Sequence, residues 1–116
     1  MPDLLIHMPG NINENIAVIE IKPEKETSVN DKGIKKDIRV LKEFINGTDV
    51  VEGYYKGILL LYSPRSDRID EETIKERYSE IIKGTIGEDW SEYSPKIYLI
   101  WHPKPKSEPI YIDWSS

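Results

Sequence analysis

Residues 57–62, with the sequence Gly-Ile-Leu-Leu-Leu-Tyr, form a near-continuous apolar run in the middle of the chain. A strand with one face in water alternates apolar and polar side chains, whereas an uninterrupted apolar run suits a central strand that is buried on both faces. A sheet that contains such a strand has to be covered by other elements, which directs the chain toward an α/β sandwich.

Two helical patterns flank this run. The first begins after a cap at Asn30 or Asp31 and ends near Asn46-Gly47, a strong stop signal. The second is expected over residues 70–83, with three acids in its first turn that suit the positive end of the helix dipole, and Gly84 as its terminator. The apolar stripes at helical spacing are Ile34, Ile38, Leu41, Phe44 and Ile45 in the first helix and Ile74, Tyr78, Ile81 and Ile82 in the second.

Four further strands are expected. They cover residues 3–7, 16–22, 96–102 and 110–114. The first two form a hairpin about a turn at residues 9–15, and Pro23 ends the second of them. Residues 85–95 are expected to be irregular. The resulting order, β-β-α-β-α-β-β, predicts a mixed β-sheet flanked by helices.

Three charged side chains converge at one end of the predicted hairpin. Folding its two strands antiparallel brings Asp3 close to Ile21 and Lys22, and the alternation of side chains places Glu20 and Lys22 on one face. Two carboxylates and one ammonium group can hold a hard divalent cation against a phosphate. Glu20 also interrupts an otherwise apolar strand, and a carboxylate in a central strand should be paired or bind a metal.

The pattern Pro2-Asp3, an apolar hairpin and then Glu20-Ile21-Lys22 resembles the PD-(D/E)xK nuclease superfamily, whose fold is restriction-endonuclease-like. The likeness covers about the first fifth of the chain, and the rest matches as element order. In that superfamily a helix and usually a strand precede the hairpin. Their absence before Asp3 predicts a nuclease-like domain over residues 1–116 that is shortened at its N-terminus. The edge strand left unpaired in this way predicts a homodimer.

The resemblance implies hydrolysis of DNA phosphodiester bonds with Mg²⁺ or Mn²⁺. A bound divalent cation stabilises charge on the attacking and leaving oxygens and lowers the pKa of a bound water. Asp3 and Glu20 would bind the metal, and the backbone carbonyl of Ile21 would be the third ligand. Lys22 would orient the attacking water or stabilise the charge of the transition state.

Other interpretations of these residues stay open. Glu20 and Lys22 could form a surface salt bridge, which would contribute about 0–1 kcal/mol. The chain could also be a non-catalytic relative that serves as a binding or dimerisation module, or an unrelated α/β domain in which the motif arose by chance. The basic residues of the first helix could contact phosphates, although a solvated helix face is the simpler interpretation. They are Lys35, Lys36, Arg39 and Lys42.

Composition limits the classes of function. A chain of 116 residues suits one domain, and its net charge of −5 is opposite in sign to that of proteins that bind nucleic acid over their whole surface. The absence of cysteine excludes disulfide frameworks and thiolate zinc sites, and His7 and His102 lack ligand spacing. No apolar run approaches the length of a membrane span, so a cytoplasmic protein without a membrane partner is expected.

Overall fold

The computed structural model describes residues 2–8, 11–24, 32–47, 53–63, 70–104 and 106–116. This part of the chain contains five strands and three helices. In chain order they are β1 (Leu4–Met8), β2 (Asn11–Pro23), α1 (Lys32–Asn46), β3 (Lys56–Tyr62), α2 (Glu71–Ile86), α3 (Trp90–Tyr93), β4 (Ile97–His102) and β5 (Ile110–Ile112). The predicted order is confirmed, with the short helix α3 as an addition. Among the described helices, none has the length and apolar character needed to cross a membrane.

The strands form one mixed sheet in which the spatial order β1-β2-β3-β4-β5 equals the chain order. The three central strands β2, β3 and β4 are parallel to one another, and the outer strands β1 and β5 run antiparallel to their neighbours. Parallel neighbours need a crossover connection, and α1 and α2 supply the two crossovers. The expected mixed α/β sheet is therefore present, with the apolar run of residues 57–62 in its central strand.

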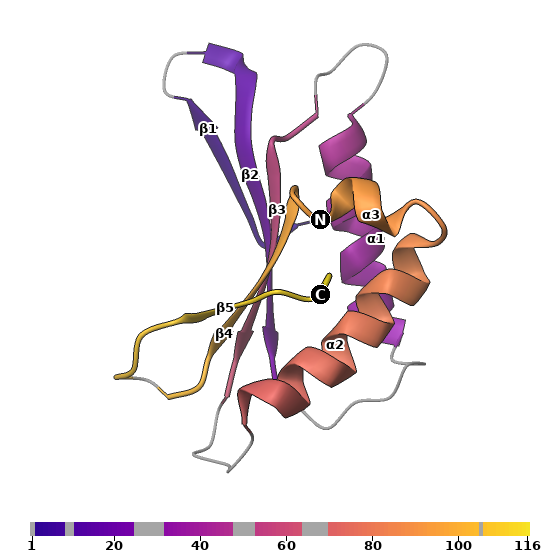
Figure 1. Ribbon diagram of the computed structural model, residues 1–116. Coiled ribbons are helices and arrows are strands. Elements are labelled where there is room, and N and C mark those ends of the chain that lie inside the picture. Colours follow the sequence, from indigo (N-terminus) through magenta and orange to yellow (C-terminus); the bar gives the residue numbers. More distant parts are fainter. Residues whose placement is uncertain (1, 9–10, 25–31, 48–52, 64–69, 105) are drawn as a thin grey trace.

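Figure 1 shows all three helices on the same side of the sheet, so the domain has two layers. We call the sheet face under the helices the inner face and the opposite one the outer face. Crossovers of one hand that progress in one direction along a sheet place both helices on the same side. In β3, Leu59 and Leu61 are fully buried on the inner face, whereas Ile58 and Leu60 on the outer face are only partly buried. The predicted helices flank the sheet on one side, and the prediction that β3 is buried on both faces is wrong for the outer face.

The hydrophobic core lies between the inner face and the two long helices. The predicted helical stripes are confirmed, because their members are buried apart from Phe44, which packs at the margin of the core. The buried apolar positions on the two long helices are Ile34, Ile38, Leu41 and Ile45 of α1, and Ile74, Tyr78, Ile81, Ile82 and Ile86 of α2. The sheet contributes Val18, Leu59, Leu61, Ile97, Leu99 and Trp101.

Strand β2 begins earlier than predicted. The expected turn at residues 9–15 is wrong for its second part, because β2 starts at Asn11 and pairs Asn11 with Met8 and Asn15 with His7. The register shifts twice between Ile6 and Met8, which marks β-bulge irregularities in the ladder. The end of the hairpin is thus irregular in its backbone pairing, and Pro23 ends the strand as predicted.

Helix α2 passes through Gly84 and ends two residues later, so the predicted terminator is wrong. Gly84 lies within the helix on its exposed side, and a Cβ added at this residue would meet open space. The residue that ends the helix is Gly87, with φ of 99° and its N–H bonded to the carbonyl of Lys83. Positive φ favours glycine, and burial of Ile86 anchors the additional turn. At the other end, Asp70 caps the helix by accepting a 2.8 Å hydrogen bond from the N–H of Thr73.

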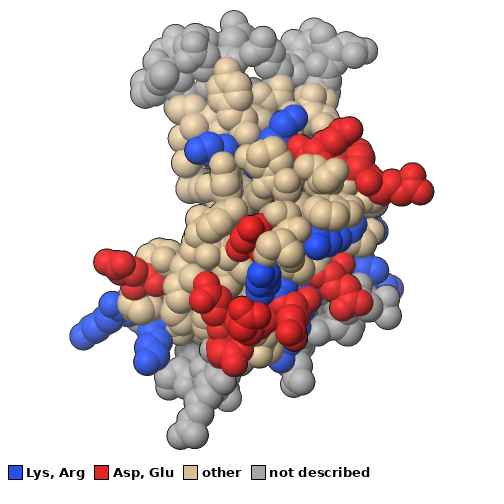
Figure 2. Space-filling view, viewed as in Figure 1, with Lys and Arg blue, Asp and Glu red and all other residues tan. Residues whose placement is uncertain are grey.

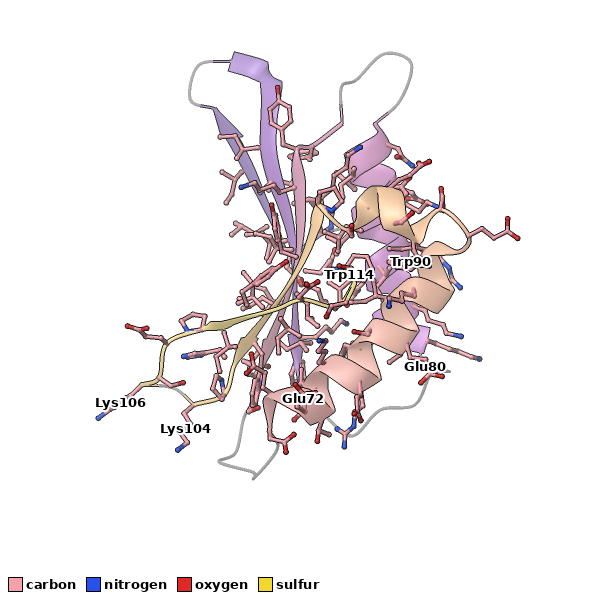
Figure 3. All side chains as sticks on the ribbon, viewed as in Figure 1. Glu72, Glu80, Trp90, Lys104, Lys106 and Trp114 are labelled. Atoms are coloured by element: carbon pink, nitrogen blue, oxygen red, sulfur yellow. The ribbon has the colours of Figure 1, made fainter. Side chains whose placement is uncertain are left out.

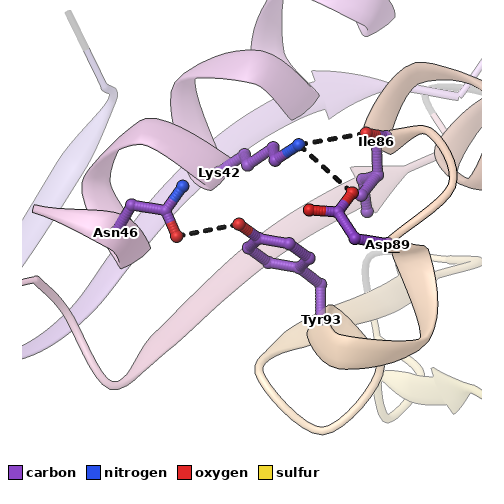
Figure 4. Close-up of polar contacts among 5 residues, drawn as sticks. All are labelled: Lys42, Asn46, Ile86, Asp89 and Tyr93. Atoms are coloured by element: carbon purple, nitrogen blue, oxygen red, sulfur yellow. Dashed lines mark hydrogen bonds and ion pairs between the residues drawn. The ribbon is translucent and has the colours of Figure 1, made fainter.

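Polar contacts join α1 to the end of α2 and to α3 (Figure 4). Nζ of Lys42 donates to the carbonyl of Ile86 at 3.0 Å and lies 3.4 Å from Oδ1 of Asp89. The same ammonium group lies 5.2 Å from the ring centre of Tyr93, whose hydroxyl donates to Asn46. Lys42 therefore satisfies a terminal carbonyl of α2 and is not available as part of a basic face for phosphate.

Two tryptophans pack at the end of the domain formed by α3 and the C-terminal residues. The rings of Trp90 and Trp114 meet edge to face at 6.2 Å, and Figure 3 shows them between α3 and the C-terminal segment. The indole N–H of Trp114 donates to the carbonyl of Ile97 at 2.8 Å, and Lys83 lies over the ring of Trp90. Residues 90–93, expected to be irregular, are thereby held as a single helical turn.

Candidate functional site

The hairpin places Asp3 beside Glu20, as the sequence predicts. Leu4 pairs with Ile19 in the antiparallel ladder, so the preceding residue Asp3 lies next to Glu20. Oδ2 of Asp3 accepts a 2.7 Å hydrogen bond from the backbone N–H of Ile21. This bond fixes one oxygen of an exposed carboxylate at the place where the sheet edge meets solvent.

Glu20 lies on the inner face and is 3% exposed. It follows the core residue Val18 by two positions, so strand alternation turns its side chain toward the helices. Within the described part of the chain, Oε1 of Glu20 has no hydrogen-bond partner. A buried carboxylate oxygen without a partner costs folding free energy, by roughly 1–3 kcal/mol or more for a charged group.

The pKa of Glu20 is raised to about 7, mainly by burial and then by the neighbouring carboxylates of Asp37 and Asp3. Each of these causes acts against the ionised form, because desolvation penalises charge and like charges repel. A cation placed among these oxygens would remove both penalties.

Glu24, directly after the end of β2, provides a contrast. It is 5% exposed, but its Oε1 lies 3.3 Å from Nη1 of Arg77 on α2, and its backbone N–H donates to the carbonyl of Tyr62. Two acids of similar burial thus lie four residues apart. One has a cationic partner in the protein, whereas the other has a free oxygen that faces further carboxylates.

Lys22 is held by a residue that the sequence analysis did not assign to the site. Its Nζ lies 3.3 Å from Oδ2 of Asp37 on α1, within ion-pair distance but without hydrogen-bond geometry. Asp37 is 7% exposed, and burial raises its pKa although Lys22 opposes the shift. The interpretation of Glu20 as one half of a surface salt bridge is wrong, because Glu20 is buried.

A signal for Asp37 exists in the sequence. The residue lies three positions after Ile34 and four before Leu41, within the apolar stripe of α1. A helix residue at that spacing faces the core, so an acid there needs a partner from the sheet.

The remaining candidates lie apart from these four residues. His102 contacts the carbonyl of Ser107 through Nε2 at 2.8 Å, in the β4–β5 connection. The side chain of His7 lies outside the described side chains. Lys104 and Lys106 project from the tip of the β4–β5 connection, away from the body of the domain (Figure 3).

The residues of the hairpin fit a divalent cation in part. Nowhere in the described ranges do three or more His, Cys, Asp or Glu side chains form a group that could hold a metal ion. The available donors are the carboxylates of Asp3 and Glu20, and Mg²⁺ characteristically takes one or two protein carboxylates and completes its shell with water. The free oxygen of Glu20 among like charges is the feature that fits such an ion.

Comparisons of sequence and structure give no match between this chain and any known protein family, any curated protein or any solved structure.

Proposed function

We propose that this chain is a metal-dependent nuclease-like domain that hydrolyses DNA phosphodiester bonds. In this proposal Asp3 and Glu20 hold Mg²⁺ or Mn²⁺ together with the backbone carbonyl of Ile21, and Lys22 assists the attack of water. The PD-(D/E)xK pattern and the order β-β-α-β-α-β-β support a restriction-endonuclease-like core.

The free oxygen of the buried Glu20 carries the proposal. A glutamine at this position would avoid an ionised group in the core, yet the chain retains a carboxylate beside two others. Natural sequences break local folding rules chiefly at functional sites. The acid therefore favours a role that needs its negative charge.

Each residue of the proposed site would have a separate role. A divalent cation in this place would stabilise negative charge on the phosphate and on the attacking oxygen. Asp3 is exposed and gives access from solvent, while Glu20 supplies a ligand from the interior. Asp37 restrains Lys22, whose ammonium group is then positioned to stabilise charge on the phosphate.

DNA contact would have to be local. Figure 2 shows acidic and basic side chains mixed over the surface in this view, with acids at least as prominent. The described residues in this view form no broad basic surface that could bind DNA. The cation and nearby Lys22 would therefore provide most of the attraction for phosphate.

The test is Mn²⁺ binding by calorimetry, followed by cleavage of plasmid, linear, single-stranded and branched DNA with Mn²⁺. The parent should bind the ion and cleave, whereas Asp3→Ala and Glu20→Gln should do neither. Glu24→Gln is the matched control, because it removes one equally buried carboxylate directly after the end of β2 and should still bind Mn²⁺. Absence of Mn²⁺ binding at millimolar concentration, or cleavage that survives Glu20→Gln, would reject the proposal.

A second candidate is a non-catalytic binding or dimerisation module of the same architecture. The large apolar surface on the outer face of the sheet favours it. The same assay separates the two candidates, because a module of this kind would neither bind Mn²⁺ through Asp3 and Glu20 nor cleave DNA.

A further inference from the structure

The outer face of the sheet is apolar across its whole width. The strand registers align two rows of side chains that cross four strands each on this face. The first row is Ile21, Leu60, Ile100 and Tyr111. The second row is Leu4, Ile19, Ile58 and Tyr98. Every position in both rows is apolar or aromatic.

This pattern is unusual for a face that contacts water. A sheet with one solvated face alternates apolar and polar residues, whereas parallel strands covered on both faces carry near-continuous apolar runs. The parallel strands β2, β3 and β4 have the second pattern, although the described helices all lie on the inner face. The sequence is therefore suited to a further layer on the outer face, which the described helices do not supply.

The outer face exposes several large apolar side chains. Five of them are between 39% and 53% exposed: Leu4, Ile6, Ile21, Tyr62 and Tyr111. At roughly 200 Å² for a fully exposed large side chain, they present about 450 Å² of mainly apolar surface. This is a little over half of the roughly 800 Å² that each partner buries in a standard interface, and partly exposed neighbours such as Ile58 and Leu60 add to it.

The charge distribution also favours a second copy of this chain as the partner on this face. Among the described side chains of the five strands, the outer face has no carboxylate, and its charged member is Lys56, which lies over the ring of Tyr98. The acids of the hairpin site lie on the inner face or at its edge. Burial and then the carboxylate of Asp113, which follows β5, raise the pKa of Tyr111, so Asp113 lies beside the edge of this face. Over the strands themselves, two copies with a net charge of −5 can meet without placing carboxylates against one another.

We propose that a second copy of this chain covers the outer face, so that two sheets pack face to face in a two-fold symmetric homodimer. Sheets pack in this way about 10 Å apart, and an apolar face that packs on itself satisfies the requirement of a two-fold interface that the same patch be used twice. The helices and the Asp3–Glu20 pair would lie on the outside of the assembly. The inference is thus independent of the proposed function.

The experiment is sedimentation equilibrium of the full chain from 1 to 100 μM. The parent should sediment at twice its mass of 13.5 kDa. Ile6→Asp combined with Tyr111→Asp places charge at both ends of the face at exposed positions and should weaken dimerisation by at least about 30-fold. Ser91→Asp on α3 adds one such charge on the helical side and should leave the dimer intact. A parent that stays monomeric at 100 μM, or a dimer that persists in the double variant, overturns the inference.

A second measurement does not depend on the stability of the charged variants. The chain has no cysteine, so Leu60→Cys introduces a unique thiol at the centre of the face. Its reaction with a bulky maleimide should slow as protein concentration rises, whereas that of Ser91→Cys should not. Equal rates at all concentrations contradict the dimer.

The three tyrosines of this face could instead stack the bases of a single strand. Anisotropy with a labelled oligonucleotide tests this alternative. Binding by a monomeric parent that is lost in Tyr98→Ala and Tyr111→Ala would assign the face to nucleic acid and overturn the inference.

Discussion

Nζ of Lys22 on β2 lies 3.3 Å from Oδ2 of Asp37 on α1, so the first crossover helix is tied to the acid-x-lysine motif of the hairpin. The side chain of Asp37 is 9% exposed and that of Lys22 is 36% exposed, which places the pair at the boundary between core and solvent. Through Asp37, the helix also contributes to the electrostatic environment of Glu20.

Removing the charge of Asp37 should lower the pKa of Glu20 below about 7, because Asp37 is the strongest of the neighbouring charges that raise it. The measurement is a carbon NMR titration of the Glu20 carboxyl group in Asp37→Asn. Glu43→Gln, which changes an exposed charge on the same helix, is the control. An unchanged Glu20 titration in Asp37→Asn would show that the two carboxylates do not interact.

The metal-free protein should lose stability as pH rises from about 4.5 to about 7. Burial raises the folded-state pKa of Glu20 above its usual value of 4.5, so the folded state binds more protons than the unfolded state within this interval. The unfolding free energy then falls with pH, by about 2–3 kcal/mol from this group. Urea denaturation in EDTA at several pH values measures the trend. A free energy that rises through this interval would contradict the assignment of the shift to folding.

Replacing Glu20 with glutamine should remove that pH dependence. At pH 8 the variant should be more stable than the parent by about 2 kcal/mol, because an amide avoids the buried charge, and at pH 4.5 the two should be similar. Mn²⁺ binding should be lost in the same variant. A gain in stability together with a loss of metal binding would show that the carboxylate serves function at the expense of stability. A variant less stable than the parent at pH 8 would mean that the charge of Glu20 stabilises the fold.

Lys42→Met should destabilise the fold by about 1–2 kcal/mol. The substitution removes the donor to the carbonyl of Ile86 and the ion pair with Asp89, and leaves a helix-terminal carbonyl without this partner. Arg39→Met, at an exposed basic position of the same helix, should change stability by less than about 0.5 kcal/mol. Urea denaturation of both variants gives the comparison, and equal effects would argue that Lys42 acts as a solvated residue.

The two glycines near the end of α2 should respond in opposite directions to alanine. Gly84→Ala should stabilise the protein by about 0.5–1 kcal/mol, since the position is helical and a methyl group meets open space. Gly87→Ala should destabilise it by about 1 kcal/mol, because φ at this residue is 99°. Thermal unfolding of both variants tests where the helix ends. A destabilising Gly84→Ala would place the end at Gly84 instead.

The local sequence pattern predicted the secondary structure correctly where the periodicity of the apolar residues was strong. The stripe of Ile34, Ile38 and Leu41 predicted α1, and the apolar run of residues 57–62 predicted the central strand. The ends of elements were less predictable. Gly84 and Gly87 are both able to end a helix, and burial of Ile86 against the sheet decides between them.

The hairpin motif itself determined that Asp3 and Glu20 lie together, because antiparallel register is a local property of two neighbouring strands. The tertiary structure decided the rest of the site and the coverage of the sheet. Asp37 reaches Lys22 only because the crossover turns α1 back over β2, a contact between residues fifteen positions apart that no local pattern encodes. In the same way, the apolar strands indicated that both faces of the sheet are buried. The common hand of the two crossovers instead placed every described helix on one face of the sheet. The apolar side chains of the outer face favour burial, but they do not specify what covers them.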